Sequence, residues 1–311
     1  MSRFGYFLSK VKSLAPTTTF TNFLIVAFMT SLTWGMTGIF VRVLPPISPL
    51  IITLGRLLIA LFVTMLIILC VPKIRQSFLL AFKYSISYVL ALLLCGYYIL
   101  ATVAFQMAPV AEVALLLSTP PLFILILRFL LGLKPTKMEI SGALLSIMGI
   151  VYIMAPTISL NNAVSTEHLY GNIIAIFAAA LTAIYAFVYR SLDGKKSIPS
   201  PMGVSLLTFL LGSVLIAIVV SFTSCSLGLE QLSTFDFLIF MGLGIFSTAF
   251  PTLGFAIASK NLPSIITAII SLFIPLFSGV FAYIFLGENL SANFFIGCFL
   301  VLSGVVLIVK K

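Results

Sequence analysis

Ten apolar segments follow one another along this chain, and each is about as long as a helix that crosses a bilayer. Such a helix needs about 20 predominantly apolar residues. Hydrophobic residues make up 61% of the 311 and charged residues only 8%, whereas soluble domains have roughly a quarter charged residues. The sequence therefore predicts an all-α membrane protein with ten transmembrane helices, at 21–42, 49–71, 84–107, 109–131, 137–155, 170–190, 201–222, 236–258, 263–285 and 291–309.

The basic residues indicate how these helices are oriented. The net charge is +10, but the 17 Lys and Arg residues form short clusters between apolar segments, which argues against a nucleic-acid partner. Cytoplasmic loops of membrane proteins are enriched in Lys and Arg. With the N-terminus inside, 15 of the 17 lie on the inner side: Arg3, Lys10, Lys12, Lys73, Arg75, Lys83, Arg128, Lys134, Lys137, Arg190, Lys195, Lys196, Lys260, Lys310 and Lys311. This alternation predicts that both termini are cytoplasmic.

The N-terminal segment and the cysteines add little chemistry. Residues 1–20 are polar and basic, without a short apolar core or a cleavage site, so we expect a cytoplasmic segment followed by an uncleaved first span. Cys70, Cys95, Cys225 and Cys298 have no close spacing. We expect packing residues rather than disulfides or metal ligands, and we expect no cofactor.

The chain carries an internal repeat. Residues 109–123, PVAEVALLLSTPPLF, align without a gap with residues 263–277, PSIITAIISLFIPLF. After a one-residue shift, Gly142 and Gly149 align with Gly297 and Gly304. Five helices is an odd number, so a second copy must have the opposite orientation. We therefore predict two inverted five-helix halves, 21–155 and 170–309, joined by an outer linker at 156–169.

These motifs resemble the drug/metabolite transporter superfamily, and specifically its ten-helix EamA-type permeases. The two proline-containing spans carry the resemblance, together with LGENLS at 286–291 before a Gly-containing last helix, Arg56 in span 2 and Trp34-Gly35 in span 1. One departure is GLKPT at 132–136, where the family shows an acidic GE like that of the second half.

The resemblance implies a secondary transporter that exports amino acids or related amphipathic metabolites across a bacterial inner membrane. Other branches of the superfamily carry nucleotide sugars or S-adenosylmethionine, some of them by exchange, and this alternative stays open. The expected partners are the lipid bilayer, a small-molecule substrate and a coupling proton. The expected assembly is a monomer or a weak homodimer.

Two ionisable residues, Arg56 and Glu112, lie clearly within predicted spans. Such groups are expensive in a bilayer and are functional candidates. Both are predicted in the outer half of the membrane at similar depth. Three alternatives stay open: the two neutralise each other, Glu112 reaches the outer aqueous boundary, or Arg56 attracts a carboxylate or phosphate while Glu112 takes an amine or a coupling proton. We expect His168, in an outer loop, to be merely solvated.

Aromatic and hydroxyl side chains supply further candidates. Trp34 lies deeper in span 1 than an interfacial residue would. Together with Tyr97 and Tyr98 near the middle of span 3 it can line a partly aromatic cavity, although ordinary helix packing explains all three equally well. Ser271 in span 9 is a weaker substrate-binding candidate.

Prolines interrupt the predicted spans at matching places. Pro120 and Pro121 in span 4 and Pro275 in span 9 lie near the middle of the bilayer, and Pro251 is expected to break span 8. Proline removes a helical hydrogen bond and frees a carbonyl, which lipid tolerates only where neighbours or water satisfy it. Paired interruptions in inverted halves indicate a central site, although each proline can also be a packing kink.

Other function classes lack the residues that they need. The spans contain no histidine, and Glu112 is the only acid that lies clearly within one, so no serine–histidine or paired-aspartate enzyme can be built. No phosphate-binding Gly-Lys-Ser/Thr loop of a primary pump is present. A passive channel remains an alternative to a carrier.

Overall fold

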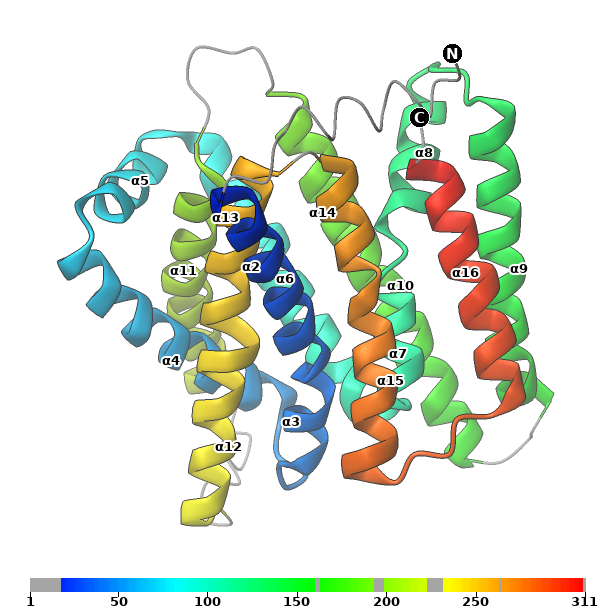
Figure 1. Cartoon of the computed structure of the whole chain (residues 1–311). Coiled ribbons are helices and arrows are strands. Elements are labelled where there is room, and N and C mark those ends of the chain that lie inside the picture. Colours follow the sequence, from blue (N-terminus) through cyan, green and yellow to red (C-terminus); the bar gives the residue numbers. More distant parts are fainter. Residues whose placement is uncertain (1–17, 160–162, 193–198, 223–231, 263, 310–311) are drawn as a thin grey trace.

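The computed structural model describes residues 18–159, 163–192, 199–222, 232–262 and 264–309. Within these ranges all regular secondary structure is helical (Figure 1). The predicted N-terminal segment, apart from its last three residues, and Cys225 lie outside the described residues, as does part of the predicted linker.

The helices follow the predicted spans closely. Those up to residue 159 are α2 (Thr18–Gly35), α3 (Thr37–Val43), α4 (Pro49–Cys70), α5 (Pro72–Lys83), α6 (Ser85–Met107), α7 (Val110–Leu116), α8 (Pro120–Leu130) and α9 (Lys137–Ser159). Those after it are α10 (Ala163–Arg190), α11 (Pro201–Phe222), α12 (Thr234–Gly244), the π-helix η2 (Ile245–Ala249), α13 (Phe250–Asn261), α14 (Ser264–Ser271), α15 (Phe273–Leu286) and α16 (Ala292–Val309).

Nine helical segments in the described ranges are long and apolar enough to cross a membrane. The remaining predicted span, 263–285, contains α14 and α15, which have 8 and 14 residues and are separated by Leu272. The prediction of an all-α membrane protein is thus confirmed.

Local sequence explains where several helices begin and end. Proline stands at the first position of α4, α5 and α11, where its missing N–H costs no helical hydrogen bond. The side chains of Ser233 and Asp236 form a capping box at the start of α12. Gly287 ends α15 with φ 65°, a left-handed conformation that favours glycine.

Small residues bring α9 and α16 together, and the two helices lie side by side in Figure 1. A Cβ atom on Gly142 would lie 2.6 Å from the carbonyl oxygen of Gly304, and one on Gly149 would lie 2.8 Å from that of Gly297. Ser146 between them donates to the carbonyl of Val301. The four glycines of the internal repeat therefore permit a close approach of α9 and α16 to each other.

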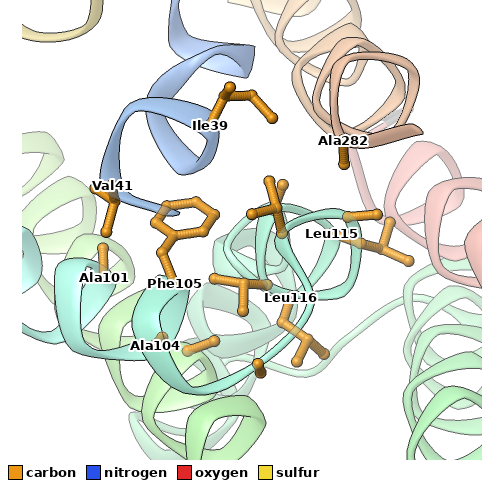
Figure 2. Packing of buried hydrophobic residues seen from close by; sticks show 14 of the residues in the cluster. Ile39, Val41, Ala101, Ala104, Phe105, Leu115, Leu116 and Ala282 are labelled. Carbon is orange, nitrogen blue, oxygen red and sulfur yellow. The ribbon is translucent and has the colours of Figure 1, made fainter. Parts of the chain in front are cut away.

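The main core gathers around α7. Figure 2 shows Phe105 from α6 beside Leu116 of α7, and Val41 from α3 beside Ala101 of α6; Ile39 and Leu115 belong to the same cluster. Large apolar side chains elsewhere point outward, among them Phe222, Leu69 and Phe299. Such a surface is suited to hydrocarbon as its solvent rather than water.

Candidate functional site

Arg56 is the largest fully buried side chain in the described residues, with 2% of its surface exposed. It projects from α4, which packs against α6, α11, α12 and η2. Its Nε donates to the Oγ1 of Thr248 at 3.0 Å, and its Nη2 donates to the carbonyl oxygen of Ser247 at 3.4 Å. Thr248 Oγ1 in turn donates to the carbonyl of Leu243 at 2.8 Å, so its lone pairs remain available to the guanidinium.

Pro251 explains why a backbone carbonyl is available to Arg56. In an α-helix the carbonyl of Ser247 would accept from the N–H of residue 251, and proline has no N–H. The prediction that Pro251 breaks span 8 is wrong, since the chain stays helical through the π-helix η2 and into α13. The π-helix η2 accommodates the missing N–H of Pro251 without a break. The carbonyl of Ser247 accepts from Nη2 of Arg56 instead.

Two tyrosines of α6 complete the surroundings of Arg56. The guanidinium carbon lies 4.8 Å from the ring centroid of Tyr98, a cation–π distance. The hydroxyl of Tyr98 is 3.3 Å from Oγ1 of Thr252 on α13. The ring of Tyr97 lies 5.4 Å from that of Tyr98. Of the three aromatic residues predicted to line one cavity, these two therefore lie beside the buried arginine.

No carboxylate faces Arg56 in the described parts of the chain. The hydrogen bonds of its guanidinium go to a hydroxyl and a carbonyl, and Nη1 makes none. A buried charge without a counter-ion is costly. The hydroxyl of Thr248, the carbonyl of Ser247 and the ring of Tyr98 reduce that cost, but none of them carries a negative charge that would compensate the guanidinium. The arrangement suits a ligand that brings its own carboxylate or phosphate.

Glu112 lies elsewhere and does not pair with Arg56, so the predicted alternative of mutual neutralisation is wrong. Its Oε2 is 2.8 Å from Nε2 of His168 and 2.9 Å from Nδ2 of Asn172, one helical turn apart on α10. The expectation that His168 is merely solvated is also wrong. The helix begins at Ala163, earlier than predicted, and carries His168 to Glu112.

Trp34 and Ser271 have other interaction partners. The Trp34 ring packs on Phe255 of α13 at 5.3 Å. Because Thr252 and Phe255 lie three residues apart, they share one face of α13, so α13 links Tyr98 to Trp34 through neighbouring side chains. Ser271 donates within its own helix, to the carbonyl of Thr267.

The two proline-containing spans are both interrupted. Span 4 divides into α7 and α8 at residues 117–119, directly before Pro120 and Pro121. The hydroxyls of Ser118 and Thr119 donate to the carbonyls of Leu115 and Leu116, which also accept from the backbone N–H groups of the same two residues. The second interruption is at Leu272 between α14 and α15, three residues before Pro275. There the carbonyl of Ile270 accepts from Ser31 of α2.

Comparison with known proteins assigns the chain to a protein family over most of its length. The model of the EamA-like transporter family matches residues 21–155 and 169–310. This chain belongs to the EamA-like transporter family. An uncharacterized transporter of Archaeoglobus fulgidus is 28% identical over 199 residues, covering 64% of this chain and 67% of that protein. A solved crystal structure is 20% identical, covers 92% of this chain and 96% of its own, and has a TM-score of 0.64, which shows a shared fold.

This EamA-like transporter is thus a multi-pass membrane protein that handles small molecules. Sequence reasoning missed the residues of span 8 that contact Arg56 and Tyr98, namely Ser247, Thr248 and Thr252. The signal was present, because three hydroxyl residues flank Pro251 in an otherwise apolar segment. It also missed Glu288, whose carboxylate accepts from backbone amides at the start of α7.

Proposed function

We propose that this protein is a secondary carrier that exports small carboxylate-bearing metabolites, most simply amino acids, with Arg56 as the carboxylate-binding residue. The observation that carries the proposal is the buried guanidinium, which has no carboxylate partner and no hydrogen bond at Nη1 among the described residues. A bidentate pair between Arg and a carboxylate is among the strongest charge-assisted hydrogen bonds. The substrate carboxylate engages Nη1 and Nη2, and the carbonyl of Ser247 is released.

The surroundings of Arg56 suit an amphipathic ligand. Tyr97 and Tyr98 offer aromatic surface, and Thr252 offers a hydroxyl at the end of the Tyr98 side chain. A small zwitterion with an apolar side chain matches one charge, two rings and a few hydroxyls better than a polyanion does. Nucleotide-like metabolites remain the second candidate, because the same rings can stack on a base.

The carrier has ten spans in two inverted halves, 21–155 and 170–309, with both termini cytoplasmic in a bacterial inner membrane. Several observations support this arrangement. The family model matches the chain twice. Gly132 and Gly287, at matching places after α8 and α15, are the two glycines with positive φ in the described residues. The first residues of α2 and the last of α16 lie at the same end of the bundle (Figure 1).

Transport follows alternating access between these halves. Glu112 in the first half bonds to α10 in the second, and Glu288 in the second half bonds to α7 in the first. Both contacts lie at the predicted outer end, so they hold the halves together on that side. Outward release requires them to open. We assign the coupling proton to Glu112. A proton on its carboxylate would weaken the contacts with His168 and Asn172 and so favour opening of the outer end.

Counterflow in proteoliposomes tests the proposed function. Vesicles would be loaded with one unlabelled amino acid at a time, and uptake of the same amino acid in labelled form would be measured. The corresponding amides, nucleotide sugars and S-adenosylmethionine would be tested in the same way. Arg56→Gln should reduce transport by about 10- to 100-fold, since a hydrogen bond to a charged group contributes about 1.5–3 kcal/mol. Arg56→Lys should retain part of it.

The matched control is Arg42→Gln, because the Arg42 guanidinium is exposed and donates to the backbone of Gln106. It should transport like the parent protein. Equal transport of amino acids and their amides would overturn the carboxylate role of Arg56. Counterflow of nucleotide-like compounds alone would favour the second candidate, and flux without saturation or counterflow would indicate a channel.

A further inference from the structure

Helix α5 connects α4 to α6 and has two contrasting faces. Phe78 and Ala81 are buried against the bundle. The helix also approaches α11 very closely, because a Cβ atom on Gly203 would clash with the carbonyl oxygen of Ser77. One face of α5 is thus fixed to the protein, and the orientation of the opposite face is fixed with it.

The opposite face combines cations with exposed leucines. It is formed by Pro72, Arg75, Gln76, Leu79, Leu80 and Lys83, which line a hollow of about 460 Å³. Arg75, Leu79 and Lys83 are spaced four residues apart and so form one stripe along the helix. Leu79 is 60% exposed and Leu80 is 43% exposed. We call these six residues the α5 face.

The positive charges of α5 have no counter-ions within the described structure. The helix sequence, PKIRQSFLLAFK, contains no acid. The ion pairs found in the described ranges join Arg128 to Glu139 and His168 to Glu112, and neither involves α5. Lys73, Arg75 and Lys83 therefore present three uncompensated charges beside apolar side chains.

The position of α5 indicates what lies against this face. Figure 1 shows α4 leaning outward and α5 at the periphery of the bundle, at the end where α2 begins. The residues just before α5, Leu69 and Val71, are exposed and apolar, as expected of a surface in contact with lipid. Leucines between cations suit the boundary between acyl chains and headgroups, where long basic side chains reach up to phosphates.

We propose that the α5 face binds an anionic phospholipid, with Arg75 and Lys83 on the phosphate and Leu79 and Leu80 against the acyl chains. A basic segment next to a membrane is attracted to anionic lipid. Free phosphate supplies the charge but leaves the leucines in water, so a lipid satisfies both parts of the face. The site is independent of Arg56 and of the transported substrate.

Lipid retention by the purified full-length protein tests this proposal. The protein would be delipidated in mild detergent and titrated with phosphatidylglycerol, with phosphatidylcholine and with inorganic phosphate, and bound lipid would be counted by native mass spectrometry. Phosphatidylglycerol should bind more tightly than phosphatidylcholine. Arg75→Gln with Lys83→Gln should weaken its binding by about fivefold per charge removed and leave phosphatidylcholine binding unchanged.

The matched control removes two exposed cations at the same end of the protein, Lys134→Gln with Lys137→Gln. It should retain phosphatidylglycerol like the parent. Equal loss in both double variants would show a general charge effect and overturn the site, as would equal binding of the two lipids to the parent. Leu79→Ser with Leu80→Ser distinguishes a phospholipid from free phosphate as the ligand. This double variant should weaken phosphatidylglycerol binding, and unchanged binding would show that the α5 face recognises phosphate alone and overturn the lipid site.

Discussion

The carboxylate of Glu288 accepts hydrogen bonds from the amide nitrogens of Val110, at 2.9 Å, and Ala111, at 3.4 Å. Glu288 follows α15, and the two amides belong to the first turn of α7, which has no acceptor for them within its own helix. One side chain thus fixes the start of α7 to the loop after α15. In the aligned half, Leu133 stands where Glu288 stands, so a carboxylate is present at only one of the two places.

Replacing this carboxylate should loosen the predicted outer end. Glu288→Gln keeps the shape but removes the charge that favours a helix N-terminus, a loss of about 1 kcal/mol. A cysteine placed at buried Ala114, in a background without native cysteines, should then react about fivefold faster with a water-soluble maleimide. Glu167→Gln, an exposed acid on α10, is the control. Unchanged labelling in Glu288→Gln would show that the cap does not hold this end closed.

The sequence predicted the spans well because lipid leaves a chain few choices. Backbone groups in hydrocarbon must bond within the protein, so a long apolar segment becomes a helix. The same constraint made Pro120 and Pro275 informative, since a missing N–H has to be accommodated in the same span. The glycines of α9 and α16 were informative because only small residues permit such close contact.

The partners of Arg56 were not predictable in the same way. Hydropathy gives the depth of a residue but not the direction in which its side chain points. Arg56 and Glu112 were therefore placed at similar depth and treated as a possible pair, although they project from helices with different neighbours. Helix ends are equally hard to place: a start at residue 170 left His168 in a loop, whereas α10 begins at Ala163 and directs it toward Glu112.

Restoring the backbone donor at position 251 should affect substrate binding rather than folding. In Pro251→Ala the new N–H can bond to the carbonyl of Ser247 and compete with Nη2 of Arg56. We expect an unchanged or higher melting temperature, because the helix gains a hydrogen bond, together with tighter substrate binding by isothermal titration, because Nη2 no longer has to leave the carbonyl of Ser247. Thr248→Val removes the acceptor that orients Nε of Arg56 and should weaken binding. Unaltered affinity in both variants would show that the acceptors of Arg56 in η2 have no part in substrate binding.

The glycine contact between α9 and α16 should be sensitive to added volume. Gly142→Val places new atoms against the carbonyl of Gly304, which is backbone and cannot move aside. Overpacking of this kind costs about 1–3 kcal/mol, and the melting temperature in detergent should fall accordingly. Gly96→Ala is the control, because its Cβ would meet only the end of the Leu181 side chain at 3.0 Å. Similar losses in the two variants would refute a specific α9–α16 contact.

Neutralising Glu112 should separate exchange from accumulation. If Glu112 carries the coupling proton, Glu112→Gln keeps a side chain that can still bond to α10 but cannot release a proton. Counterflow of the substrate between equal pools should then continue at a near-normal rate, because exchange needs no net proton movement. Accumulation against a gradient should lose its dependence on an imposed proton gradient. His168→Gln tests the partner side of the contact and should keep gradient-driven transport, since it leaves the carboxylate in place. A Glu112→Gln variant that still responds to the proton gradient would place coupling on another residue.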